Sequence, residues 1–547
     1  MRARASLLLF VLAALLAAAP ARHDRTIDPA TRVDHDGVPV ARPAKRDIGL
    51  YAHMFHQAIV MPISHFFDLP DKILWLLGPM GVDLRQEAAN ANAFDEVPNS
   101  TWFTNRNHIR AVSPAEIRRG PFDGILPEKP WTVTELKKGG FNAGFQIKDA
   151  NDKHWIIKLD RVGYPRASSG AGVVSSRLVW AAGYNISLEQ AVLFRRDDLR
   201  FETQVASAAP DDPPVEPSRL DEMLEHTARS TDGSYCADAS LFLPGKVVGP
   251  IDFSGKRKDD PNDWYRHRNR RELRGLYVFY SWLNNWDVKD QQSLDMFDET
   301  QGKEGHLHHY LLDVNGSLGA AAEGAKPLPY GYEKRIDFGG IGKRLVSFGF
   351  IREPWRKAPQ RSGIASVGNF EGDTFHPKRW RPLQEVPPFH EMSPRDAYWG
   401  AKLVCSFSDA QIQAAIDAAR YEDPRAPVYL IEVLQKRREK IARYWFDRVA
   451  PLDYFEVRSE RLHFHDLARD LGMAQARSYA VELSSSASGV PERSFVVSST
   501  EIPLPHNAPH GSTLSLELSL SGRSAKSVHV DLQRSGSGWV LTRIRHA

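Results

Sequence analysis

The spacing of apolar residues changes twice along the chain, and this limits the fold more than any other feature of the sequence. From Trp131 to Asp160 apolar and polar residues alternate, and two strand patterns flank a turn sequence at residues 150–153. Between residues 270 and 445 the apolar residues recur at helical spacing, with a capping-box pattern at Ser408-Asp409-Ala410-Gln411, and after about Leu462 the alternation returns. The sequence therefore predicts an α+β chain with a β-rich part, a helical part and a small C-terminal β domain.

The first residues have the pattern of a secretory signal. Arg2 and Arg4 precede an apolar run from Leu7 to Ala19, and Ala19-Pro20-Ala21 is a small-residue cleavage pattern. The run is shorter than the roughly 20 residues that a membrane-spanning helix needs. We expect a signal peptide at residues 1–21, no membrane anchor, and export to a periplasmic or extracellular location.

Overall charge and cysteine content exclude some classes of function. The 71 Lys and Arg residues nearly balance the 68 Asp and Glu residues, and the net charge of +3 predicts no nucleic-acid partner. Cys236 and Cys405 are the only cysteines, which excludes a disulfide scaffold and a Cys-rich zinc site. Whether the two cysteines pair is left open.

Two candidate parts of a phosphate site lie in the β-rich part. Gly140 and Gly144 belong to a glycine-rich stretch between two strand patterns, where backbone N–H groups could approach a phosphate. An ordinary hairpin turn is the commoner explanation for such glycines. Lys158 ends an apolar strand and could hold phosphates, or its stem could cover apolar surface while its charge reaches water.

The most specific string follows the helix predicted at residues 270–286. Asp287 is followed by Lys289 and Gln292, and an apolar strand then ends at Asp313. This arrangement resembles the catalytic loop of protein kinases and the metal-binding Asp that comes after it. The resemblance implies that Asp287 is the catalytic base, Lys289 the loop lysine, and Asp313 with Gln292 the metal ligands.

Three positions depart from the kinase pattern. Gln292 replaces an Asn, and the segment 170–184 holds no acidic residue, since Gly172 stands where the lysine's Glu partner is expected. Glu189 and Asp160 are possible substitutes for that partner. A literal Asp-Phe-Gly at Asp337 does not follow a buried strand pattern, and we favour Asp313 as the metal ligand.

Further phrases, at residues 97–106, 270–275 and 395–400, are similar to those of a largely uncharacterised family of secreted bacterial proteins. That family has a kinase-like core reminiscent of the secretory-pathway and spore-coat kinases. The resemblance implies a two-lobed protein-kinase-like core. The implied parts are a leader and N-terminal helical extension (22–128), a β-rich N-lobe (129–249), a helical C-lobe (250–461) and a β-rich C-terminal domain (462–547).

Two clusters have ordinary explanations. His306, His308 and His309 could form a zinc site, but no third ligand of clear spacing lies nearby, and we favour polar residues at the entry to a strand. The basic run at residues 437–440 is interpreted as the solvated face of a helix, with an anionic partner as the alternative.

The sequence thus predicts an exported kinase-like protein that binds ATP or another nucleotide with Mg²⁺ and could phosphorylate a hydroxyl acceptor. A catalytically degenerate scaffold, or an interaction protein contacting the cell envelope through its C-terminal β domain, is the alternative. The acceptor or envelope partner is unknown.

Overall fold

The computed structural model describes residues 36–46, 60, 86–136, 143–207, 217–301, 303–347, 350, 354–357, 362–475, 477–486, 492–521, 526–536 and 538–547. The predicted signal peptide, residues 22–35, 47–59 and 61–85 of the predicted leader and N-terminal extension, and Gly140 lie outside this described part. None of the described helices combines the length and the apolar character needed to cross a membrane.

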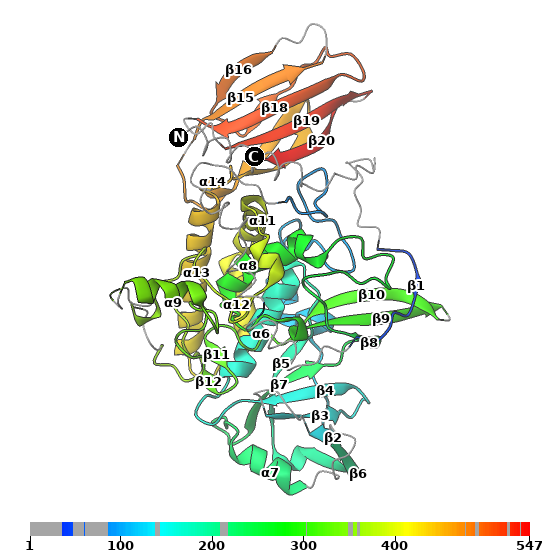
Figure 1. The fold of residues 1–547 in the computed structure, drawn as a ribbon, viewed down its shortest axis with the longest axis vertical. Coiled ribbons are helices and arrows are strands. Elements are labelled where there is room, and N and C mark those ends of the chain that lie inside the picture. The colour runs from blue at the N-terminus through cyan, green and yellow to red at the C-terminus, as the bar shows by residue number, and fades with distance from the viewer. Residues whose placement is uncertain are drawn as a thin grey trace, which may run out of the picture.

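A six-stranded sheet lies at one end of the molecule (Figure 1). Its strand order is β5-β7-β4-β3-β2-β6, and only β2 and β6 are parallel neighbours. The strands are β2 (Trp131–Leu136), β3 (Gly144–Lys148), β4 (His154–Leu159), β5 (Glu189–Phe194), β6 (Leu199–Ser207) and β7 (Tyr235–Leu241). The predicted hairpin around residues 150–153 is confirmed, because β3 and β4 pair in antiparallel register.

Different helices cover the two faces of this sheet. Trp155 and Ile157 of β4 share an apolar cluster with Leu220 and Leu224 of helix α7 (Pro217–Glu225). Successive side chains of a strand point to opposite faces. Lys158 therefore points to the other face, where α6 (Ala167–Ala182) packs against β5 and β7.

The helical part is built around α8 (Arg271–Leu283), all of whose residues are buried. It packs against α11 and α13, and α12 lies between α13 and α6. The other helices here are α5 (Pro114–Arg119), α9 (Phe338–Val346), α10 (Pro387–His390), α11 (Pro394–Cys405), α12 (Asp409–Ala418) and α13 (Arg425–Trp445). The predicted capping box at Ser408 is confirmed, because its side chain accepts from the backbone N–H of Gln411.

A second sheet extends from the side of the helical part (Figure 1). Its order is β1-β10-β9-β8, with β1 at Val40–Ala41, β8 at Lys246–Gly249, β9 at Ser293–Gln301 and β10 at Glu304–Leu311. The strand β10 ends two residues before Asp313. Two short strands, β11 (Ala320–Ala321) and β12 (Gly324–Ala325), pair a little farther along the chain.

The C-terminal residues form two sheets around one apolar cluster. The smaller has the order β13-β14-β17 and the larger β16-β15-β18-β19-β20. The strands are β13 (Leu452–Arg458), β14 (Arg461–Asp466), β15 (Tyr479–Ser485), β16 (Arg493–Val497), β17 (Glu501–Pro503), β18 (Thr513–Leu520), β19 (Ser527–Ser535) and β20 (Gly538–His546). The larger sheet and the six-stranded sheet lie at opposite ends of the long axis, with the helices between them (Figure 1).

Candidate active site

Strand register places Lys158 and two carboxylates on one face of the six-stranded sheet. Lys158 of β4 is directly opposite Asp238 of β7, and Ser240 of β7 is directly opposite Glu189 of β5. Residues paired in this way, or two apart along a strand, project to the same face. Lys158, Asp238 and Glu189 therefore meet on the face that packs against α6.

The amine of Lys158 has four polar neighbours. Its Nζ donates to Asn315 Oδ1 at 2.8 Å and to Asp313 Oδ1 at 3.3 Å. Glu189 Oε2 is 3.5 Å away and Asp238 Oδ2 is 3.9 Å away. Burial alone would lower the pKa of Lys158, but the charges of Glu189, Asp313 and Asp238 outweigh it and raise that pKa. Lys158 is therefore a fixed cation at neutral pH.

Glu189 and Asp238 are neighbouring buried carboxyls whose pKa values shift in opposite directions. Burial and the neighbouring Glu189 raise the pKa of Asp238 well above its usual range. Burial opposes ionisation of Glu189 too, but Lys158 outweighs it and lowers the pKa of Glu189. Glu189 Oε2 and Asp238 Oδ1 accept no hydrogen bond from the described residues, and a proton held by Asp238 and donated to Glu189 satisfies both oxygens.

Asn315 connects this cluster to α6. Its Nδ2 donates to Asp238 Oδ2 at 2.9 Å and to the carbonyl of Ser168 at 3.2 Å. A Cβ on Gly172 would lie only 2.4 Å from Asn315 Nδ2, so a residue with a side chain does not fit there. Of the two candidate partners of Lys158, Glu189 on β5 is the one that lies beside its amine.

Asp160, the other candidate partner for Lys158, has a different role. Its carboxylate accepts from the backbone N–H groups of Ser169 and Arg166 at 2.9 and 3.1 Å. It also accepts from the Ser169 hydroxyl. Asp160 therefore holds the first turn of α6 in place.

The loop after α8 presents Asp287. The helix ends at Asn284, which has left-handed backbone angles. Asp287 Oδ2 then accepts from Lys289 Nζ at 2.8 Å and from Gln292 Nε2 at 2.7 Å. The carboxylate is thus held by two donors from its own loop.

Backbone contacts bring this loop to the strand that delivers Asp313. The N–H of Leu312 donates to the carbonyl of Gln292 at 2.9 Å, and that of Trp286 donates to Gly316 at 3.3 Å. A Cβ on Gly316 would lie 3.7 Å from the Cβ of Asp287. The Asp287 loop and the Asp313 segment therefore run side by side, and Lys158 contacts the latter.

Solvent reaches this cluster at Asp313. Its side chain is 43% exposed, compared with 20% for Asp287 and 9% for Lys158. Because the amide nitrogen of Gln292 donates to Asp287, its Oε1 is left for another partner. Asp313 and Gln292 could supply two oxygens to a divalent cation. No group of three His, Cys, Asp or Glu side chains with metal-binding geometry occurs among the residues described.

Gly144 has a packing explanation. It lies in β3 directly opposite Lys158, and a Cβ there would be 2.2 Å from the carbonyl oxygen of Ile157. The close approach of β3 and β4 therefore requires glycine. A contact of Gly144 with phosphate stays a prediction, as does that of Gly140, which is outside the described residues.

Other candidates from the sequence lie elsewhere. Asp337 accepts from the N–H of Gly340 at 2.8 Å in the first turn of α9. His309 bonds Asp295 at 2.7 Å and stacks on Trp102, so it belongs to a buried contact. Cys236 and Cys405 are both free.

The interpretation of residues 437–440 as a solvated face was wrong for Arg437. This guanidinium is 3% exposed and lies 3.8 Å from the ring centre of Phe375. Its position could have been predicted, because Arg437 is four residues from both Val433 and Ile441 and shares their face of the helix. The ring of Phe370 also lies against Arg437, with its centre 4.9 Å from the guanidinium carbon.

Comparison with known proteins adds only distant similarities. No family model matches the sequence, and no curated protein is significantly similar to it. The proinflammatory kinase CtkA of Helicobacter pylori aligns over 56% of this chain and 93% of its own, with 10% identity and a TM-score of 0.30.

Two structures of the Golgi casein kinase align more extensively. One covers 75% of this chain and 96% of its own at 10% identity and a TM-score of 0.29. The other, with Mn/ADP bound, covers 74% and 94% at 9% identity and the same TM-score. Similarity at this level leaves the function to be argued from the site.

Proposed function

We propose that the chain is an exported protein with a two-lobed kinase-like core that binds a nucleotide between its β-rich and helical parts and transfers phosphate to a hydroxyl acceptor. The observation that carries the proposal is the meeting of Lys158, Asp313 and the Asp287 loop, which come from three distant segments. Phosphoryl transfer needs a cation for the phosphates, a metal-holding carboxylate and a residue that orients the acceptor. The export step depends on residues 1–21, and N-terminal sequencing of the protein recovered outside the cytoplasm tests it.

Each residue has a role that fits its surroundings. Lys158 is a permanent cation held by Glu189, so it can bind phosphate oxygens without losing its position. Asp313 is the most exposed acid of the cluster and, with Gln292, would hold Mg²⁺. The metal would neutralise charge on the phosphates.

Asp287 and Lys289 act on the acceptor side. Asp287 accepts a hydrogen bond from the acceptor hydroxyl and takes its proton as that oxygen bonds to the terminal phosphorus. The bond between this phosphorus and the bridging oxygen then breaks, and the nucleoside diphosphate leaves with its electron pair. Lys289, 2.8 Å from Asp287, is placed to offset the charge on the transferred group.

Binding and transfer can be measured separately. ATP with Mg²⁺ should raise the melting temperature of the full chain, because a ligand bound only by the folded state stabilises it. Asp313→Asn should abolish the Mg²⁺-dependent part of this shift. Asp337→Asn, which changes the literal Asp-Phe-Gly but not the cluster, is the matched control and should keep the shift.

Transfer is tested with labelled phosphate and a panel of hydroxyl acceptors. Asp287→Ala should lower incorporation by about 10²- to 10⁴-fold, the usual contribution of a catalytic base, while the thermal shift remains. Absence of any nucleotide-dependent shift in the wild-type protein would refute the proposal.

Binding without transfer is the second candidate, and the contacts of Lys158 favour it. Its Nζ already donates to Asn315 and Asp313, and the Glu189 carboxylate lies 3.5 Å away. A phosphate that takes two or more of the amine's three donors must displace Asn315 or Asp313. A nucleotide-dependent shift with no incorporation, unchanged by Asp287→Ala, would identify a binding scaffold.

A further inference from the structure

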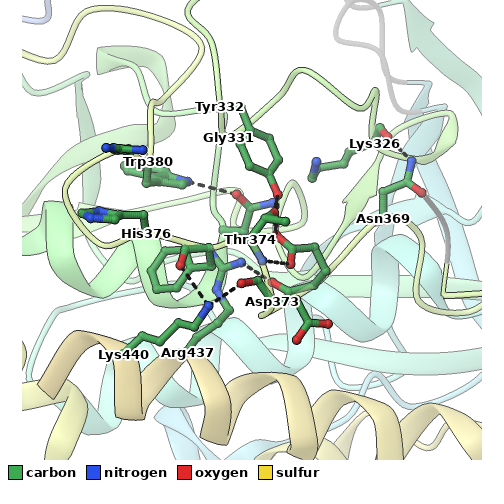
Figure 2. Close-up of a pocket in the computed structure, with 14 residues that line it drawn as sticks. Lys326, Gly331, Tyr332, Asn369, Asp373, Thr374, His376, Trp380, Arg437 and Lys440 are labelled. Atoms are coloured by element: carbon green, nitrogen blue, oxygen red, sulfur yellow. Dashed lines mark hydrogen bonds between the residues drawn. The ribbon is translucent and has the colours of Figure 1, made fainter. Parts of the chain in front are cut away.

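A cavity of about 330 Å³ lies in the helical part and includes none of the proposed nucleotide-site residues. Its walls come from Asn284 at the end of α8, from Lys326 and residues within the ranges 331–332 and 369–380, and from Arg437 and Lys440 of α13. Figure 2 shows Lys326 reaching in from one side, with Arg437 and Lys440 rising from α13 on another. The volume is at the lower end of the range of about 300–1,000 Å³ typical of small-molecule sites.

The cavity is lined by cations that form no ion pair with a described carboxylate, although the charge of Glu371 acts on Lys326, Arg437 and Lys440 at longer range. Lys326, Arg379, Arg437 and Lys440 form no ion pair within 4 Å with any carboxylate in the described ranges. Lys326 and Arg437 are both only 3% exposed. Their hydrogen bonds go to backbone carbonyls, from Lys326 Nζ to Tyr330 at 2.8 Å and from Arg437 Nη1 to Glu371 at 2.7 Å.

The acidic residues of the cavity are already engaged. The Glu371 carboxylate accepts from the Tyr332 hydroxyl, and from the N–H and hydroxyl of Thr374, both at 2.8 Å. Asp373 pairs with Lys436, which does not line the cavity. Because these carboxylates are engaged by other donors and a buried cation without an ion pair is costly, the lining favours an anion from outside the chain.

Two unsatisfied polar atoms also belong to lining residues. Arg437 Nε is a buried donor and Asn369 Oδ1 a buried acceptor, and neither has a hydrogen-bond partner among the residues that the structure describes. Buried polar atoms are rarely left in this state in folded proteins. A ligand that offers both acceptors and donors would satisfy them.

Electrostatics at Lys326 agree with this interpretation. Burial, and next the charge of Arg437, lower the pKa of Lys326 to about 7, with Glu371 opposing them. The other charged or titratable side chains lining the cavity are Lys440 of α13 and Tyr332, Asp373, His376 and Arg379 of the segment 326–380. A bound anion would favour the protonated amine, so its binding should take up protons near neutral pH.

We propose that this cavity binds a small organic anion, a phosphate- or carboxylate-bearing compound of monosaccharide size. Lys326, Arg437 and Lys440 hold its acidic group, and the rings of Tyr332, Phe375 and Trp380 pack against its body. The site is separate from the proposed nucleotide site and does not depend on that proposal.

Calorimetric titration of the full chain tests this assignment. The probes are inorganic phosphate, glucose 6-phosphate, gluconate and uncharged glucose. We expect at least one organic anion to bind and glucose not to bind. Preference for glucose 6-phosphate or for gluconate then identifies the acidic group as phosphate or carboxylate.

Two variants locate the binding, and a third is the control. Lys440→Gln and Lys326→Met should each weaken binding of the anion at least tenfold. Lys326→Met should also abolish the proton uptake on binding, which is measured by titration in buffers of different ionisation enthalpy. Arg443→Gln removes one charge from the same helix outside the cavity and should change nothing. No binding of either organic anion at millimolar concentration, equal binding of glucose, or equal weakening by Arg443→Gln would overturn the proposal.

Discussion

At the scale of single residues, Lys326 should leave a signature in the pH dependence of stability. Its pKa is about 7 in the folded chain and near 10.5 when unfolded, so between these values the unfolded chain binds one more proton. The free energy of unfolding therefore rises with pH in this window. From pH 7 to pH 9 the wild-type protein should gain about 2 kcal/mol relative to Lys326→Met.

Urea denaturation at both pH values measures this difference. Lys436→Met is the control, since Lys436 lies on the exposed side of α13 and its pKa is raised by Asp373. It should show no relative change between pH 7 and pH 9. If the free energy of unfolding changed equally between pH 7 and pH 9 in the wild-type protein and in Lys326→Met, the buried amine would stay protonated throughout.

A second residue-scale prediction concerns glycines in helices. Gly172→Ala should destabilise the protein by about 1–3 kcal/mol, because the new methyl group would overlap Asn315 in a packed interior. Gly342→Ala in α9 has open space and should be neutral or stabilise by up to about 1 kcal/mol. Thermal unfolding of the two variants compares them directly, and equal effects would show that Asn315 can move away.

At the scale of elements, the segments 270–275 and 395–400, two of the phrases that resemble a known family, lie where α8 and α11 cross. A Cβ on Gly400 of α11 would lie 2.6 Å from the carbonyl oxygen of Gly275 in α8. Beside this crossing, Asp396 bonds Arg271 Nε and Arg274 Nη1, both at 3.1 Å. These residues hold the two helices together, which gives the phrases a structural role.

Removal of this buried carboxylate should be costly. Asp396→Ala removes the carboxylate that pairs with buried Arg274 and one of the two that pair with buried Arg271, and should destabilise the protein by about 3–5 kcal/mol. Asp409→Ala, at an exposed position in the first turn of α12, is the control and should have a small effect. A small effect of Asp396→Ala in chemical denaturation would mean that water or another acid replaces the carboxylate.

Local patterns predicted elements better than they predicted the site. The alternation before and after residues 150–153 and the capping box at Ser408 are set by nearby residues, and both elements occur as predicted. Asp238 and Asn315 were not predicted as neighbours of Lys158. These residues meet because of the strand register and the path of the chain after Asp313. Neither is encoded by a repeating pattern of neighbouring residues. Asp238, an acid in a strand of small and apolar residues, was the one available signal.

At the scale of the whole molecule, Asp95 joins the C-terminal β unit to the helical part. Its carboxylate contacts Arg271 of α8 at 2.6 Å, Arg395 of α11 at 2.7 Å and His546 of β20 at 2.8 Å. The hairpin of β13 and β14 spans residues 452–466 and so includes the predicted boundary at residue 462. The C-terminal unit is therefore connected through a buried ionic contact as well as through the chain.

The contacts of Asp95 between the C-terminal β unit and the helical part, called the joint below, should also be sensitive to acid. Burial favours its neutral form, but Arg271 and the hydrogen bond from His546 outweigh it, so the pKa of Asp95 is well below its ordinary value of 3.8. A carboxyl whose pKa is lowered by folding stabilises fully above 3.8, and this stabilisation is lost as the pH falls toward the folded value. Asp95→Asn should therefore cost about 3–5 kcal/mol at pH 7 and progressively less below pH 4.

Calorimetry would show whether the joint also couples the unfolding of the two parts. Without the charge of Asp95, the C-terminal sheets keep their own apolar cluster and should melt as a unit separate from the helices. We expect one transition to become two in Asp95→Asn, whereas Asp373→Asn, at an exposed acid, should keep the wild-type profile. A single, merely shifted transition in Asp95→Asn would assign the coupling to the other contacts across the joint, such as Lys402 with Asp453.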